Sequence, residues 1–205
     1  MSPKDVKVAI SHLKKDKVLA KIISQFENPD FEPGKDHFGA LVSSIIYQQI
    51  SGKAASNIER RFRSLFKGGK LKAGKVLDLS DKDFKSVGIS PQKMKYIRDL
   101  ATKFLDGSVD PSKFHKMSDE EIRIHLVSVK GIGTWTADMF LMFTLNRMDV
   151  LPTGDLAIAK AFATIFKMRK LPDAKKMEKL ALSWRPYRTV ASWYLWKISD
   201  REKEK

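Results

Sequence analysis

The chain contains 205 residues, a length that suits one domain or two closely packed lobes, and 42% of the residues are hydrophobic, which is ample for a core. Lys and Arg number 39 against 24 Asp and Glu. The resulting net charge of +15 favours a polyanionic partner such as nucleic acid, although a solvated basic surface would have the same composition. Cysteine is absent, which excludes disulfide bonds, thiolate zinc sites and iron–sulfur clusters.

Signals for a membrane or for export are also missing from the sequence. No apolar run approaches the roughly 18 residues of a membrane-spanning helix. The opening residues Met-Ser-Pro-Lys form no apolar signal core. We therefore expect an intracellular protein that does not engage a membrane.

Helical periodicity dominates the chain from its start. Ser2 and Pro3 precede Val6, Ile10 and Leu13, which is the pattern of a capped amphipathic helix. The patterns at 80–83 and 118–121 are typical of helix caps. Further helices are predicted over residues 18–26, 38–48, 52–65, 91–105, 134–145, 155–166, 174–183 and 186–198. Period-two alternation is missing, so the sequence predicts an all-α fold.

A glycine hairpin lies between two of the predicted helices. Gly131 and Gly133 flank Ile132, so the isoleucine can enter the core while the glycines adopt backbone angles that other residues avoid. Without Cβ atoms, this turn can lie directly against a phosphate and offer it backbone N–H groups. The next helix begins at Thr134, so its positive dipole end would add to the attraction, as would Lys130. The pattern favours a sequence-independent grip on a DNA backbone; the alternative is a plain helix connection without a ligand.

A single carboxylate follows the hairpin. The helix over 134–145 is apolar almost all round, so it must be central, and it fixes the hairpin relative to Pro152, Thr153, Gly154 and Asp155. Asp155 stands at the expected start of the next helix. Taken alone, it is explained as an ordinary N-cap.

Together these motifs carry a family resemblance. Residues 126–162 resemble the helix-hairpin-helix DNA glycosylase superfamily, whose signature is this hairpin followed by Pro and an essential Asp. Residues 44–55 and 184–196 extend the likeness to its alkylbase branch, that of 3-methyladenine DNA glycosylase II, and it covers about residues 38–197. The resemblance implies two helical lobes flanking a DNA-binding cleft. We expect one lobe over about 1–36 plus 151–205 and the other over 37–150, with the helix-hairpin-helix at 118–145.

The resemblance also implies a reaction. Asp155 would stabilise the oxocarbenium-like sugar formed when the N-glycosidic bond breaks, and would orient or deprotonate the attacking water. A base alkylated at a ring nitrogen is already cationic and departs neutral, so no second acid is needed. Bifunctional relatives carry a Schiff-base lysine two positions after the second glycine. Trp135 occupies that position here, which implies a water nucleophile and an intact DNA strand.

The expected function is therefore a monofunctional DNA glycosylase that flips alkylated purines of the 3-methyladenine and 7-methylguanine type out of duplex DNA and hydrolyses the N-glycosidic bond, which starts base excision repair. Two alternatives stay open. One is a glycosylase for other lesions, such as ethenoadenine or deaminated or oxidised bases. The other is a non-catalytic helix-hairpin-helix DNA-binding protein.

Site residues follow from the same likeness. Trp135 is expected in the base pocket, where an aromatic ring favours a cationic base. The other candidates for the pocket are Tyr47, Trp184, Tyr187 and Trp193, although core packing explains each of them equally well. Gln49, ahead of Ile50, is expected to insert into the duplex as a wedge; the alternative is a simple polar connection. Contacts with the DNA backbone are expected from Lys130, Gly131, Gly133, Thr134, Thr136, Ser51 and Lys53.

The remaining expectations concern ligands and surroundings. No cofactor is required, but a structural Na⁺ or K⁺ could bind at the backbone carbonyls of Val127, Val129 and Ile132. The expected partner is damaged double-stranded DNA, the expected state is a monomer, and the expected location is with the DNA, in the nucleus or the nucleoid. The stretch 53–75 holds eight basic residues and one acid, Glu59; some of the basic residues would face phosphates and others solvent.

Overall fold

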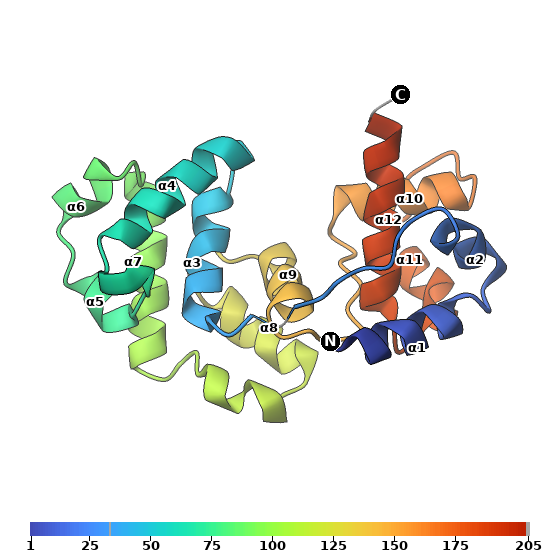
Figure 1. Ribbon diagram of the computed structural model, residues 1–205, viewed down its shortest axis with the longest axis horizontal. Coiled ribbons are helices and arrows are strands. Elements are labelled where there is room, and N and C mark those ends of the chain that lie inside the picture. The colour runs from blue at the N-terminus through green and yellow to red at the C-terminus, as the bar shows by residue number, and fades with distance from the viewer. Residues whose placement is uncertain (33, 204–205) are drawn as a thin grey trace. The chain divides into compact units, whose positions relative to one another are not determined.

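The computed structural model describes residues 1–32 and 34–203, and within them all regular secondary structure is helical (Figure 1). The all-α prediction is confirmed. The chain forms two compact units. The terminal unit comprises Met1–Pro33 and Leu141–Lys205, and the central unit comprises Gly34–Phe140. Among the described residues, no helix has the length and apolar character needed to cross a membrane.

The terminal unit is built around its last long helix. Its elements are α1 (Pro3–Leu13), α2 (Lys17–Ile23), α10 (Leu156–Ile165), α11 (Ala174–Leu180), the 3₁₀ helix η3 (Leu182–Trp184) and α12 (Arg188–Lys203). Helix α12 contacts α10, α1 and α2. Leu19, Phe162 and Tyr194 are fully buried in the resulting core. Burial of such side chains is the main favourable term that holds the unit together.

The central unit contains the middle of the chain. Its elements are α3 (His37–Tyr47), α4 (Gly52–Ser64), η1 (Lys67–Gly69), α5 (Ala73–Leu77), α6 (Asp81–Ser86), α7 (Pro91–Leu105), η2 (Pro111–Lys116), α8 (Asp119–Val127) and most of α9 (Thr134–Phe143). Helix α7 contacts α3 and α5, and α3 contacts α4. The expected capping boxes form at Ser80 and Ser118, where each hydroxyl accepts the N3 amide and the N3 carboxylate accepts the cap amide.

The boundary between the units differs from the expected one. Residues 141–150 group with the terminal unit, whereas the sequence placed the boundary at 150/151. The reason is a set of bonds to Thr189 on α12. Its hydroxyl donates to the Arg147 carbonyl at 2.6 Å and accepts the Val150 amide at 3.1 Å, and its amide donates to the Met148 carbonyl at 3.0 Å.

Candidate functional site

The glycine hairpin joins α8 to α9 and is closed by its own backbone. The Ile132 amide donates to the Val129 carbonyl at 3.0 Å, and the Ile132 side chain is only 4% exposed, so it anchors the turn in the core. Gly131 has a φ of +82°, and a Cβ built there would overlap the ring of Tyr96. A Cβ built at Gly133 meets nothing within 4 Å. Only the first glycine is therefore required by the fold.

The second glycine and the start of α9 form the outer side of the hairpin. Gly133 and Thr134 are exposed, and the Gly133 carbonyl accepts the Ala137 amide at 3.0 Å, so the helical bonding begins there. The amides of a first helical turn have no acceptor within the helix and suit an anion. The Lys130 side chain is 74% exposed, with its ammonium 3.9 Å from an Asp99 carboxylate oxygen. The hairpin thus offers amides, a helix N-terminus and a cation on one exposed surface.

A second exposed turn joins α3 to α4. Gln49 has a φ of +58° and is exposed, and Ile50 is 37% exposed. Ser51 caps α4 by accepting the Ala54 amide at 3.4 Å, and Lys53 is exposed. An exposed side chain at the tip of a tight turn suits insertion into a duplex, and the wedge at this turn stays a prediction.

The turn and the hairpin are bonded to each other. The Gln48 side-chain amide donates to the Gly131 carbonyl at 2.7 Å. The Lys93 ammonium, on α7, donates to the carbonyls of Ile46 at 2.7 Å and Gln48 at 2.8 Å, and burial lowers the pKa of Lys93. Sequence reasoning assigned no role to Gln48 or Lys93. These bonds fix the expected wedge relative to the expected phosphate grip, and residues from both line a groove of about 630 Å³.

An aromatic cavity adjoins this groove. It has a volume of about 380 Å³ and is lined by Ser43, Ser44, Tyr47, Gln48, Glu59, Trp135, Thr136 and Met139. Tyr47 is 41% exposed and Trp135 is 50% exposed. The structure therefore brings together two of the residues expected in the base pocket. Thr136 is only 5% exposed and lines both the cavity and the groove, and its contact with the DNA backbone stays a prediction.

Trp184 is a core residue and not part of a pocket. It has no exposed surface, stacks on Phe162 with ring centroids 5.2 Å apart, and donates its indole N–H to Asp16 at 3.1 Å. A fully buried ring with a satisfied N–H cannot stack on a base, so the expectation for Trp184 is wrong.

Tyr187 and Trp193 also pack on the core of the terminal unit. Tyr187 meets the ring of His12 edge-on, and Trp193 lies under the Lys197 ammonium, 4.8 Å from its ring centroid. Packing accounts for both residues, and their part in a base pocket stays a prediction.

Asp155 is the N-cap of α10, and its carboxylate is held on both sides. Oδ1 accepts the amides of Ala157 at 2.7 Å and Ile158 at 3.1 Å, and Oδ2 accepts the indole N–H of Trp196 at 3.3 Å. Trp196 was not assigned a role from the sequence, although it ends the motif at 184–196. Both oxygens are thus oriented by neighbouring groups.

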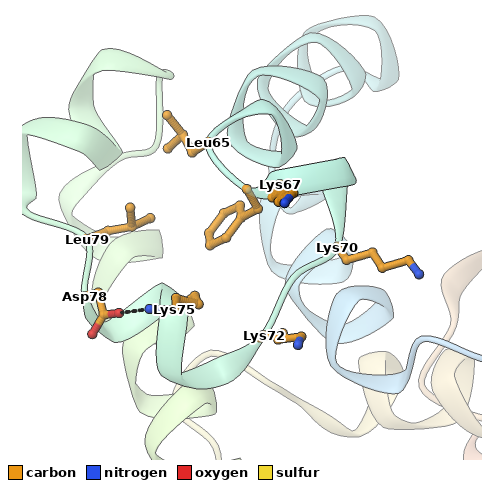
Figure 2. A pocket seen from close by; sticks show the side chains of 8 residues that line it. Leu65, Lys67, Lys70, Lys72, Lys75, Asp78 and Leu79 are labelled. Atoms are coloured by element: carbon orange, nitrogen blue, oxygen red, sulfur yellow. Dashed lines mark hydrogen bonds and ion pairs between the residues drawn. The ribbon is translucent and has the colours of Figure 1, made fainter.

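A larger cavity of about 480 Å³ lies elsewhere in the central unit (Figure 2). Leu65, Leu79 and four lysines, Lys67, Lys70, Lys72 and Lys75, line it; Lys75 pairs with Asp78 at 3.0 Å. The cavity adjoins the end of α4, a helix of 13 residues and hence about 20 Å, whereas the exposed turn precedes its start. This cavity is therefore separate from the aromatic cavity and the hairpin.

Comparison with known proteins gives consistent results. The model of the HhH-GPD superfamily of base excision DNA repair proteins matches residues 42–186. DNA-3-methyladenine glycosylase 1 of Schizosaccharomyces pombe is 32% identical over 188 residues, which cover 89% of this chain and 81% of that protein.

Two solved structures give the same match in three dimensions. Schizosaccharomyces pombe 3-methyladenine DNA glycosylase (Mag1), in complex with abasic DNA, has a TM-score of 0.81 and 30% identity, covering 94% of this chain and 96% of that one. DNA-3-methyladenine glycosidase from Bacillus halodurans has a TM-score of 0.85 and 34% identity, covering 100% of this chain and 92% of that one.

Proposed function

Because this chain belongs to the HhH-GPD superfamily of base excision DNA repair proteins, we propose that it is a monofunctional DNA glycosylase for alkylated purines of the 3-methyladenine and 7-methylguanine type. The observation that carries the proposal is the grouping in the central unit. The exposed turn, the glycine hairpin and the cavity lined by Tyr47 and Trp135 adjoin one another there. A glycosylase needs these three parts to fill the duplex, grip its backbone and hold an extruded base.

The hairpin would bind the phosphate backbone of double-stranded DNA. The amides at Gly133 and Thr134 and the ammonium of Lys130 supply donors and positive charge without reading sequence. Ser51 and Lys53, at the start of α4, would contact a second phosphate. Gln49, ahead of Ile50, would enter the space that the flipped nucleotide leaves.

Asp155 would perform the chemistry. The departing base leaves an oxocarbenium-like sugar, and a carboxylate oxygen close to that cation lowers the barrier. The same carboxylate would orient or deprotonate the attacking water. Trp196 and the α10 amides hold it in a fixed orientation, so little reorganisation is needed at the moment of bond cleavage.

A monovalent cation at the hairpin is part of the proposal but not of the chemistry. The Val129 carbonyl already accepts the Ile132 amide and has a second lone pair, so it fits as one ligand, beside the carbonyls of Val127 and Ile132. Na⁺ or K⁺ there would stiffen the turn and add positive charge beside the phosphate. We infer that the protein acts as a monomer and is located with the cellular DNA.

The direct test is release of free base from methylated duplex DNA. The wild-type protein is expected to release 3-methyladenine and 7-methylguanine in single-turnover assays analysed by chromatography. Asp155→Asn should slow release by about 100-fold or more, by analogy with the loss of one electrostatic catalytic group, while abasic DNA still binds. Release by the variant at the wild-type rate would remove Asp155 from its role, and a wild-type protein that binds DNA without release would be a non-catalytic binding protein.

A second assay addresses the nucleophile. Trp135 stands where bifunctional relatives carry a lysine, so borohydride should trap no covalent protein–DNA adduct and the strand should stay intact. A trapped adduct would contradict the water mechanism. Release measured on duplexes with ethenoadenine or hypoxanthine would define the range of lesions.

A further inference from the structure

Glu59 is a carboxylate in the wall of the aromatic cavity. It lies on α4, one turn before Arg63, and its side chain is 20% exposed. It is the one acid among the eight basic residues of the stretch 53–75, in a chain with a net charge of +15. The i,i+4 ion pair with Arg63 accounts for a glutamate at this position of α4, but it does not account for the place of the carboxylate in the cavity wall.

One oxygen of Glu59 is held in place and the other is available. Oε1 accepts the Ser43 hydroxyl at 2.5 Å and the Arg63 Nε at 2.8 Å, and Arg63 also donates to Ser43 at 3.2 Å. Within the part of the chain that the structure describes, Oε2 makes no hydrogen bond or ion pair. The carboxylate is therefore oriented by two neighbours while retaining unused acceptor capacity.

The charge around Glu59 is not cancelled by its partner. The Arg63 guanidinium is shared with Asp36, whose Oδ2 lies 3.6 Å from Nη1. Arg63 thus pairs with two carboxylates, so it does not neutralise Glu59 in full. The rest of the wall is formed by Tyr47, Trp135 and Met139 together with hydroxyl and amide groups.

We propose that Glu59 is a specificity residue of the base pocket, where its Oε2 accepts a hydrogen bond from the donor edge of a cationic alkylated purine stacked in the cavity. This inference rests on the proposed function. Alkylated adenine offers its exocyclic amino group, and alkylated guanine offers its ring N–H and amino group. The aromatic faces attract positive charge without regard to ring edges, whereas a carboxylate selects the donor edge as well as the charge.

The position of Glu59 would then favour binding of the correct bases in the cavity. A charge-assisted hydrogen bond is stronger than a neutral one, so cationic purines with a donor edge would be retained over undamaged neutral bases. Glu59 would act by binding the base, separately from Asp155, which acts on the sugar.

The test uses the full-length protein and three variants. Glu59→Gln keeps the shape but removes the charge and replaces one acceptor by a donor. Glu59→Asp keeps the charge one methylene further back. Glu120→Gln, at an exposed glutamate on α8 of the same unit, makes the matched loss of charge away from the cavity. Single-turnover release of 3-methyladenine and 7-methylguanine, affinity for abasic duplex and the unfolding temperature are measured for each.

We expect Glu59→Gln to lose tenfold or more in release of both bases while its affinity for abasic duplex, which offers no base to the pocket, stays within twofold. Glu59→Asp should retain more release than Glu59→Gln, and Glu120→Gln should match the wild type. Equal release by wild type and Glu59→Gln would overturn the inference while leaving the proposed function intact. Equal losses of release and of abasic-DNA affinity, or a Glu59→Asp variant no better than Glu59→Gln, would assign Glu59 a merely structural role. Failure of the wild type to release either base would instead refute the proposed function.

Discussion

Alanine in place of each hairpin glycine should affect a different property: stability at Gly131 and DNA affinity at Gly133. At Gly131, alanine must adopt a φ of +82°, which costs about 1–2 kcal/mol for a residue with a Cβ. The new methyl group also overlaps the Tyr96 ring, and overpacking of this kind costs about 1–3 kcal/mol. The sum is about 2–5 kcal/mol. For a chain of this size, 1 kcal/mol corresponds to roughly 2–4 °C, so Gly131→Ala should lower the Tm by at least about 4 °C.

Gly133→Ala is the matched control because the same methyl group enters open space there. Its Tm should stay close to that of the wild type. Its affinity for DNA should fall, because the methyl group holds a phosphate away from the exposed amides. Loss of one hydrogen bond to a charged group costs about 1.5–3 kcal/mol, which corresponds to roughly tenfold or more in Kd.

Thermal unfolding followed by circular dichroism and fluorescence anisotropy with an abasic duplex at fixed salt measure the two effects. The reasoning fails if Gly131→Ala unfolds at the wild-type temperature. It also fails if Gly133→Ala binds DNA as tightly as the wild type, because the exposed side of the turn would then not be the phosphate grip.

Three further substitutions test the contacts around the site. Trp196→Phe removes the indole N–H that reaches Asp155 and should slow base release several-fold while abasic-DNA affinity is kept; equal kinetics would show that the bond does not orient the carboxylate. Lys93→Met removes the donor to the carbonyls of Ile46 and Gln48, next to the turn proposed as the wedge. It should weaken DNA binding, measured by anisotropy, by a larger free energy than it takes from the free energy of unfolding. Arg123→Met leaves the buried Asp138 carboxylate unpaired, which costs about 3–5 kcal/mol at pH 7. Burial already raises the pKa of Asp138, so the folded state binds a proton at this carboxylate more tightly than the unfolded chain does. The difference in Tm between the variant and the wild type should therefore shrink as the pH falls toward that pKa. A difference that stays constant with pH would contradict this account.

Local signals explain what could be predicted from the sequence. The capping boxes at Ser80 and Ser118 and the helices that follow them depend on residues three or four positions apart, so the pattern contains their cause. The same is true of the hairpin, where two glycines around an apolar residue specify a tight turn with an anchored centre. The N-cap position predicted for Asp155 is also local, and Asp155 is the N-cap of α10.

Contacts between distant segments explain what could not be predicted. Lys93 reaches carbonyls 45 and 47 residues earlier, and no local pattern marks a lysine for that purpose. Trp184 was misassigned because the resemblance that suggested it does not separate a pocket residue from a core residue; only its full burial and its stacking on Phe162 decide between them. The sequence shows Glu59 only as one acid in a basic stretch, because its orientation depends on the hydrogen bonds with Ser43 and Arg63.

The groups proposed for binding and for hydrolysis are held in place by contacts within different units. The bonds that hold the hairpin and the wedge turn, from Gln48 and Lys93, lie within the central unit, and those described for Asp155 lie within the terminal unit. A substitution that disturbs one set therefore leaves the packing of the other intact. Effects of distant substitutions on stability add when they share no partners. Gly133→Ala and Asp155→Asn should accordingly lower DNA affinity and base release separately, and the double variant should combine the affinity of the first with the slow chemistry of the second.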